Sequence, residues 1–331
     1  MDGLPALFEG ARWHSFNTWL ARRWPHRVFK LGLDAGFTCP NIDGTVATGG
    51  CTFCLNESFS PNSRGAPRPI AAQVRDGMKF YRRRYRAEKF IVYFQAHTNT
   101  HGEVAHLRRL YDEATAFDDV VGLAIGTRPD CVPDPVLDLI SEYGERLDVW
   151  IEYGLQTKHE QTQVLVNRGH GWDAYVDAIE RTRGRPMKVC THLILGLPGE
   201  DAAMARETAD AVAGLGLDAV KIHHCYVSPG TPLALDWRAG SYRAMDLDDW
   251  LAQVCDVLER MPENVVVQRA MGELSGPFVL APLWGKNKQE LLAAVEAELA
   301  RRGTWQGAHA EGGDRRRRPE SRLRRAAGGS S

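Results

Sequence analysis

The sequence lacks the segments that would direct a protein into or across a membrane. Its first ten residues do not combine a basic start with an apolar stretch, and nowhere in the 331 residues do eighteen apolar residues follow one another. We therefore expect no secretory signal, no transmembrane helix and a cytoplasmic location. The seven cysteines of the chain suit such a reducing compartment.

The sequence also lacks an excess of charge of either sign. Its 41 lysines and arginines and 42 aspartates and glutamates leave a formal net charge of −1. The whole-chain charge therefore gives no argument for a nucleic-acid partner, and any such surface has to be local. Two arginine clusters are local in this sense, residues 82–86 and residues 315–318. Each is predicted either to hold RNA phosphates or to be a solvated face.

A fourth cysteine or histidine that would close a tetrahedral zinc shell does not follow the main cysteine run. This run holds Cys39, Cys51 and Cys54, separated by eleven residues and then by two. An iron–sulfur cubane takes one thiolate per iron, so three thiolates leave one iron free for a small-molecule cofactor. The pair of Cys51 and Cys54 alone fits a zinc site or a redox dithiol equally. The third cysteine, the glycine-rich spacer and the aromatic Phe53 favour the cluster.

What the sequence does contain is a repeated alternation of apolar runs with helical patterns. The 44% of apolar residues is enough for one domain of barrel size. Repeated strand–helix units predict a parallel sheet, either a barrel or an open doubly wound sheet. The predicted strands are 27–33, 90–95, 120–127, 147–153, 189–195 and 219–226, and the predicted helices are 70–85, 103–116, 135–143, 172–183, 202–215 and 286–301.

Chemically distinctive residues follow every predicted strand. In a parallel barrel the loops at the carboxyl ends of the strands build the active site, so these segments are expected to meet at one rim. The first strand leads into the cysteine run. The other strands lead into residues 95–100, 127–130, 152–157, 195–200 and 223–231.

Together these segments resemble the radical S-adenosylmethionine (SAM) superfamily over roughly residues 27 to 235. Thr127-Arg-Pro-Asp, Glu152-Tyr-Gly-Leu-Gln-Thr and Arg168-Gly-His are similar in particular to the YhcC/YtqA-type proteins, which are related to the elongator catalytic subunit and the coproporphyrinogen oxidase branch. The resemblance implies an α/β fold, a partial (β/α)6 TIM-like barrel with a short C-terminal extension. It also implies a [4Fe–4S] cluster, SAM on its free iron, a 5′-deoxyadenosyl radical, and an electron donor such as flavodoxin or ferredoxin.

The same resemblance implies roles for individual residues. Cys39, Cys51 and Cys54 would hold the cluster. Arg168 would pair with the methionine carboxylate of SAM, unless it is only a surface helix end. Glu152 would bind the ribose hydroxyls, unless it is a solvated strand-end glutamate. The loop from Gln95 to Asn99 would replace the absent Gly-Gly-Glu sequence at the methionine amine, and Gly196 would approach the adenine. The full set of expected cofactor contacts is Phe53, Gln95, Thr98, Glu152, Gln156, Arg168, Gly196 and Tyr226.

The expected domain organisation is a barrel with small additions. We expect an N-terminal extension over 1–26, the barrel over 27–264, a C-terminal strand and helix over 265–302, and a disordered arginine-rich tail over 303–331, whose composition cannot bury a core. The short flanks leave no room for the additional cluster domain of methylthiotransferases or for an acetyltransferase domain.

Three functions follow from these patterns. The first is a radical SAM enzyme that abstracts hydrogen, for which the resemblance suggests the tRNA wobble uridine. The second is oxidation or rearrangement of a small metabolite or tetrapyrrole. The third is a non-catalytic iron–sulfur or zinc protein that binds RNA or a partner, with His97, His223 or Cys225 as fourth ligand.

The other four cysteines, Cys131, Cys190, Cys225 and Cys255, are expected to be small buried hydrophobic residues. The alternative is a catalytic thiol or an auxiliary site, in particular at Cys190 and Cys225 on neighbouring strands inside the barrel.

Overall fold

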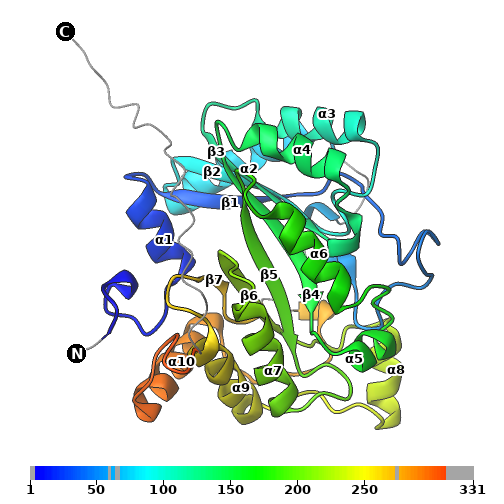
Figure 1. Ribbon diagram of the computed structural model, residues 1–331, viewed down its shortest axis with the longest axis vertical. Coiled ribbons are helices and arrows are strands. Elements are labelled where there is room, and N and C mark those ends of the chain that lie inside the picture. The colour runs from blue at the N-terminus through cyan, green and yellow to red at the C-terminus, as the bar shows by residue number, and fades with distance from the viewer. Residues whose placement is uncertain (1–3, 59–60, 64–67, 273–275, 311–331) are drawn as a thin grey trace.

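The fold is a single parallel sheet bent into a partial barrel and covered on its outer face by helices (Figure 1). The computed structural model describes residues 4–58, 61–63, 68–272 and 276–310. The strands follow one another in the sheet in chain order, and every pairing is parallel. They are β1 Val28–Leu33, β2 Lys89–Phe94, β3 Val120–Thr127, β4 Asp148–Gln156, β5 Lys188–Leu195, β6 Ala219–His224 and β7 Val266–Arg269.

The predicted fold class is confirmed, and all six predicted strands are present. The seventh strand, β7, lies in the predicted C-terminal extension and adds to the same sheet beside β6. One strand is longer than expected, since β4 continues to Gln156. This extension matters for the site, because Glu152 then lies in the middle of β4 and not near its end.

Ten α-helices in the described part of the chain connect and cover the strands. None of them is long and apolar enough to cross a membrane. They are α1 Phe16–Arg23, α2 Ile70–Tyr85, α3 Val104–Thr115, α4 Asp134–Tyr143, α5 Glu160–Leu165, α6 Trp172–Thr182, α7 Ala202–Ala213, α8 Pro232–Ala239, α9 Leu247–Arg260 and α10 Lys288–Arg302. Short 3₁₀ turns occur at Ala6–Phe8, Asn56–Ser58, Pro61–Ser63, Pro129–Cys131 and Gly276–Phe278.

Alternation along the strands separates two apolar cores. In β4, Val149 and Ile151 belong to the large core between the sheet and the helices, whereas Trp150 points into the barrel. At the amino end of the strands the barrel is closed by α1, whose Trp19 meets the Trp150 ring edge to face at 5.1 Å. In the described residues the amino end of the barrel is therefore filled by apolar side chains, and the open end is the carboxyl end.

The two edges of the sheet, β1 and β7, are joined by side chains rather than by a strand pairing in the described residues. Lys30 of β1 donates a hydrogen bond of 2.6 Å to Gln268, which lies in β7. The backbone N–H of Val267 in β7 donates to His14, just before α1. The Lys30–Gln268 hydrogen bond thus bridges the gap between β1 and β7, and the segment before α1 pairs with β7.

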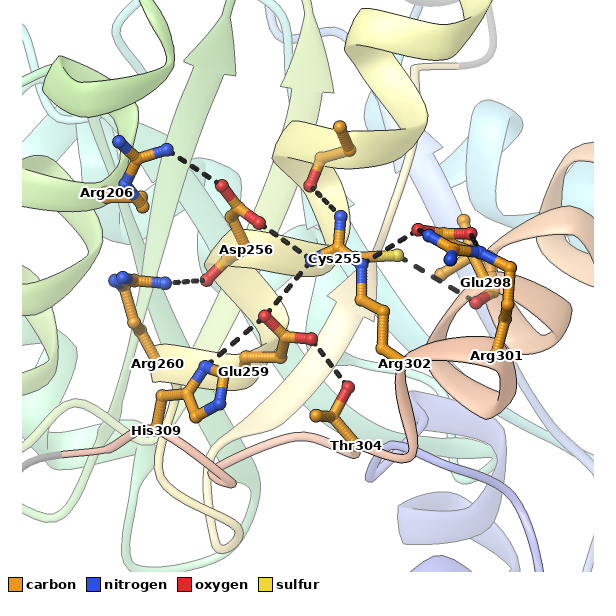
Figure 2. Close-up of polar contacts among 12 residues, drawn as sticks. Arg206, Cys255, Asp256, Glu259, Arg260, Glu298, Arg301, Arg302, Thr304 and His309 are labelled. Atoms are coloured by element: carbon orange, nitrogen blue, oxygen red, sulfur yellow. Dashed lines mark hydrogen bonds and ion pairs between the residues drawn. The ribbon is translucent and has the colours of Figure 1, made fainter.

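The end of the chain packs against the same edge. Figure 2 shows Arg302 of α10 between Asp256 and the buried Glu259, both of α9. Beyond α10, Gln306 is fully buried and hydrogen bonds to the backbone of His14 and Val265. Residues 303–310, which were expected to begin a disordered tail, therefore pack against the body of the protein. The remainder of the predicted tail, 311–331, lies outside the described residues.

Candidate active site

One cavity of 330 Å³ lies at the carboxyl ends of the strands, where the sequence predicted the active site. The loops after β1, β2, β3, β4 and β6 all contribute to its wall. Ten of the eleven expected site residues line it: Cys39, Cys51, Phe53, Cys54, Gln95, Thr98, Glu152, Gln156, Arg168 and Tyr226.

Gly196 is the expected site residue that does not line the cavity. It ends β5 with a φ of +75°, a conformation that favours glycine, and its carbonyl accepts a 2.7 Å hydrogen bond from Tyr242. A Cβ at this position would come within 2.8 Å of the Met245 side chain. The glycine is therefore explained by the packing of this turn, and its approach to adenine stays a prediction.

The cysteine loop is fixed to the segment that carries Arg168. The Thr52 N–H donates to the Val166 carbonyl, and the Asn41 side chain donates to the Asn167 carbonyl. Arg168 is itself buried, and its Nη1 lies 3.5 Å from the Cys51 sulfur. Arg168 is therefore not a surface helix end, and its position depends on the cysteine loop.

The three cysteines form a donor set that fits a metal cluster. They are free thiols, and they line one cavity. Burial, together with the neighbouring Cys51 and Cys39, raises the pKa of Cys54 to about 12. Such thiols become thiolates when a metal supplies compensating positive charge. Donors from Arg168 and Asn41 to the Cys51 sulfur also suit a thiolate.

An ion pair between the buried Arg128 and the partly exposed Asp130 supports the backbone of Arg168. The Arg128 guanidinium binds both oxygens of Asp130, at 2.9 and 2.7 Å, and donates through Nη1 to the Arg168 carbonyl at 2.8 Å. The Arg168 side chain donates to the Gly154 carbonyl, while its buried Nε has no partner in the described part of the chain. The Thr127-Arg-Pro-Asp segment thus positions Arg168, with an open donor beside the cavity for an acceptor such as a carboxylate.

The loop after β2 forms the opposite wall. Asn99 donates to the Ala96 and Gly126 carbonyls, both at 2.8 Å, and its own carbonyl accepts from Tyr111. The Thr98 N–H donates to Thr38, just before the cysteine loop. The loop predicted to stand in for Gly-Gly-Glu therefore lies in contact with the cluster-binding segment.

Glu152 lies deeper, inside the barrel wall, and is fully buried. Lys30 pairs with its Oε1 at 2.6 Å, while Lys221 and His192 both meet its Oε2. Burial alone would raise the pKa of Glu152, but Lys221 and Lys30 hold it well below the usual range. Glu152 is therefore not a solvated strand-end residue. The ribose contact expected from the resemblance stays a prediction, and a ribose hydroxyl would have to share Glu152 with these three donors.

Sequence reasoning missed the polar residues that surround Glu152. Lys221 and His192 line the cavity, and Lys30 lies beside them. Burial lowers the pKa of His192 to about 4 and that of Lys221 to about 8. The signal was present as single polar residues inside otherwise apolar strands, at the alternate positions that face a barrel interior.

The four remaining cysteines do not form a second site together. Cys255 is buried under α10, and Cys131 is half-buried. Cys190 and Cys225 both face inward, but Cys190 lies level with Ala219, six residues before Cys225. At about 3.3 Å per residue this separates the two thiols by roughly 20 Å along the sheet.

Comparison with known proteins identifies the class to which this barrel and cysteine site belong. The model of the radical SAM superfamily matches residues 42–212, and that of the Radical SAM C-terminal domain matches residues 217–301. The chain therefore belongs to the radical SAM superfamily, whose enzymes use a [4Fe–4S] cluster and SAM.

Two relatives match this chain over most of their own length. The chain is 42% identical to the uncharacterized protein YtqA of Bacillus subtilis over 296 residues, which is 89% of this chain and 92% of YtqA. It is 39% identical to the protein YhcC of Escherichia coli K12 over 285 residues, 86% of this chain and 91% of YhcC. The predicted resemblance to the YhcC/YtqA-type proteins is confirmed.

Two more distant relatives match the chain at 25% identity or less. A tRNA uridine(34) acetyltransferase of Methanocaldococcus jannaschii is 25% identical over 181 residues, 54% of this chain and 33% of that protein. The solved structure of Methanocaldococcus infernus Elp3 has a TM-score of 0.67 at 17% identity, and the match covers 85% of this chain and 64% of Elp3. At this identity the structure supports the fold alone.

Proposed function

We propose that the protein cleaves SAM reductively and uses the resulting radical to abstract hydrogen from a substrate held in the cavity. The observation that carries this proposal is the convergence of Cys39, Cys51, Cys54 and Arg168 on one cavity that is closed at its far end by α1. When bound, the cluster and SAM supply a 5′-deoxyadenosyl radical, formed as one electron cleaves the sulfonium.

The residues of the chain have distinct tasks in this proposal. The three cysteines bind the cluster, and Arg168, whose Nε has no partner among the described residues, binds the carboxylate of SAM. Gln95, Thr98 and Gln156 complete the SAM contacts, together with Phe53 and Tyr226 at the cavity wall. The apolar core at the amino end of the barrel excludes water from behind the substrate.

A reducing partner is required by enzymes of this class. The proposed donor is a flavodoxin or a ferredoxin, which would transfer one electron for each SAM molecule cleaved.

The proposed substrate is a tRNA nucleoside, supported by the name of the distant tRNA uridine(34) acetyltransferase. The arginines at 82–86 are poorly placed to guide RNA to the site. They end α2, which leads into the amino end of β2, whereas the cavity lies at the carboxyl end. Arg82 is also paired with Asp119. A small metabolite stays the second candidate, since the cavity is narrow and buried.

An anaerobic assay tests the proposed chemistry. The protein is reconstituted with iron and sulfide, mixed with dithionite and SAM, and assayed for 5′-deoxyadenosine. We expect release by the wild type and none by Cys39→Ala, Cys51→Ala or Cys54→Ala. Cys255→Ala, a change at a buried cysteine outside the cavity, is the matched control and should retain release. An intact cluster that neither binds nor cleaves SAM would contradict the proposal.

A second assay tests the substrate. The reconstituted enzyme is incubated with tRNA from a strain that lacks the protein, and nucleosides are analysed by mass spectrometry. A mass change confined to one nucleoside, dependent on SAM, supports the tRNA substrate. SAM-dependent 5′-deoxyadenosine release with unchanged tRNA favours a small metabolite.

A further inference from the structure

The inner end of the cavity carries more positive than negative charge. Lys221 and Arg269 line it, and Lys30 forms an ion pair with Glu152. Among the described residues that line the cavity, Glu152 is the one carboxylate. It is shared by two ammonium groups, those of Lys30 and Lys221, and Arg269 is close enough that its charge lowers the pKa of Lys221 further.

The other cations of the cavity already have a function. Arg128 is paired with Asp130, and Arg168 is assigned to SAM and lies against Cys51. His192 and His223 add no charge at neutral pH, because burial lowers the pKa of His192 to about 4 and that of His223 well below its usual value. The excess positive charge around Glu152 therefore comes from Lys30 and Lys221, two ammonium groups that share its one carboxylate.

Lys221 has the geometry to bind one more acceptor. Its ammonium group carries three donors, and its recorded contacts are one Glu152 oxygen and the face of the Tyr93 ring, 4.2 Å away. The groups that face Lys221 come from every neighbouring strand: Lys30, Tyr93, Glu152, Cys190, His192, His223 and Arg269. A cation buried among further cations is stabilised by an anion.

A metal ion is a poorer occupant of this region. Glu152, Cys190 and His192 offer ligand atoms within 4.8 Å of one another. Two ammonium groups on the same carboxylate would repel a divalent cation, however, and the geometry has no place for it without displacing them.

We propose that the part of the substrate that reaches this inner end carries an anionic group, a carboxylate or a phosphate, and that Lys221 binds it. Glu152 acts as a positioning residue that holds the Lys221 ammonium toward the cavity. This inference rests on the proposed function, since it names the substrate class of the same site. It leaves the remainder of the substrate outside the barrel, at the rim.

Binding of small anions tests the inference without turnover. The cluster-loaded protein with SAM is titrated calorimetrically with malonate, with inorganic phosphate and with the neutral isostere malonamide. We expect one of the two anions to bind the wild type and malonamide not to bind. Lys221→Met should weaken that binding about tenfold to a hundredfold, as for loss of a charged hydrogen bond. Lys221→Arg should retain most of it. Lys158→Met, which removes a surface lysine paired with Glu207, is the matched control.

The possible results separate the two ideas. Binding of neither anion, equal binding of malonamide, or anion binding unchanged in Lys221→Met would overturn the inference. If Lys221→Met does not fold, two measurements still test the inference. They are the comparison of malonate with malonamide on the wild type and the anion affinity of Lys221→Arg. The proposed function is judged separately, by release of 5′-deoxyadenosine from the wild type. Release of 5′-deoxyadenosine without anion binding would contradict the inference and leave the proposed function standing.

Discussion

At the scale of single residues, Glu152 sets the electrostatics of the barrel interior. Its two oxygens meet Lys30, Lys221 and His192; Glu152 and Lys221 are buried, whereas Lys30 and His192 are partly exposed. Buried ion pairs of this kind contribute little net stability, because desolvation offsets the attraction. Their retention inside a barrel wall is therefore better explained by ligand binding than by folding.

The lowered pKa of Lys221 predicts a specific pH dependence of stability. Burial shifts this pKa from 10.5 to about 8, so the unfolded chain binds the proton more tightly than the folded protein. The unfolding free energy should therefore rise as pH increases from about 8 to about 10.5, by roughly 3 kcal/mol at most. Lys221→Met should lack this rise. Urea denaturation of both proteins at several pH values measures the difference, and parallel pH profiles would contradict the prediction.

The site residues that could be predicted from their spacing in the sequence were the cysteines, because cysteine is rare and binds metal clusters. Cys39, Cys51 and Cys54 were predicted from their positions in the sequence, and the structure brings them to one cavity. Lys30 and Lys221 were not predicted as site residues. A polar residue at an alternate position of an apolar strand indicates a side chain that faces the barrel interior, but the sequence does not show that the two lysines meet at Glu152, because the curvature of the sheet brings them together.

At the scale of elements, β4 runs the full height of the barrel. Asp148 lies at its amino end, Glu152 in the middle and Gln156 at the cavity rim. The sequence predicted an earlier end, at Tyr153, because a glycine and polar residues usually follow a strand. In this barrel Gly154 instead continues the strand, where the wall approaches Arg168.

Gly154→Ala is expected to disturb SAM binding through this approach. An added Cβ would lie 2.8 Å from the Arg168 guanidinium and 2.9 Å from the Gln156 amide, two groups assigned to SAM. We expect SAM affinity to fall about tenfold or more while the cluster still assembles. Gly214→Ala, whose Cβ would meet nothing closer than 3.6 Å, is the matched control. Calorimetric titration measures the SAM affinity, and iron content measures cluster assembly. Unchanged SAM affinity in Gly154→Ala would count against the SAM-binding roles proposed for Arg168 and Gln156.

The turn after β3 supports the same arginine from another element. Arg128→Met would leave the Arg168 carbonyl and the Asp130 carboxylate without their donor. Leaving the buried Arg168 carbonyl without its donor costs about 1–3 kcal/mol, which should appear in chemical denaturation, whereas the partly exposed Asp130 can be solvated. SAM affinity should fall as well, because Arg168 loses its support. Arg108→Met, at an exposed pair with Glu142, should leave both quantities unchanged. Equal behaviour of the two variants would refute this positioning role.

At the scale of the whole molecule, the two ends of the described chain close the open edge of the barrel together. Arg12 and His14, before α1, bond to Glu296 and Gln306, near the end of the chain. The fold of the barrel followed from its strand–helix repeat, whereas this closure did not. Gln306 lies in a segment rich in glycine and polar residues, and its burial depends on partners almost three hundred residues away, which local composition cannot reveal.

The C-terminal closure makes a prediction about stability. Arg302 joins α10 to α9 through Asp256 and the buried Glu259, and it also binds Glu298 (Figure 2). Arg302→Met removes the guanidinium from Glu259, which is 2% exposed, and should lower the unfolding free energy by roughly 3 kcal/mol.

Arg301→Met is the matched control, because the adjacent Arg301 is largely exposed and pairs only with Glu298 among the described residues. Its loss should have no measurable effect, since an exposed ion pair contributes little. Urea denaturation of both variants beside the wild type separates the two positions. Equal stability of the two variants would show that this edge is held by apolar packing alone.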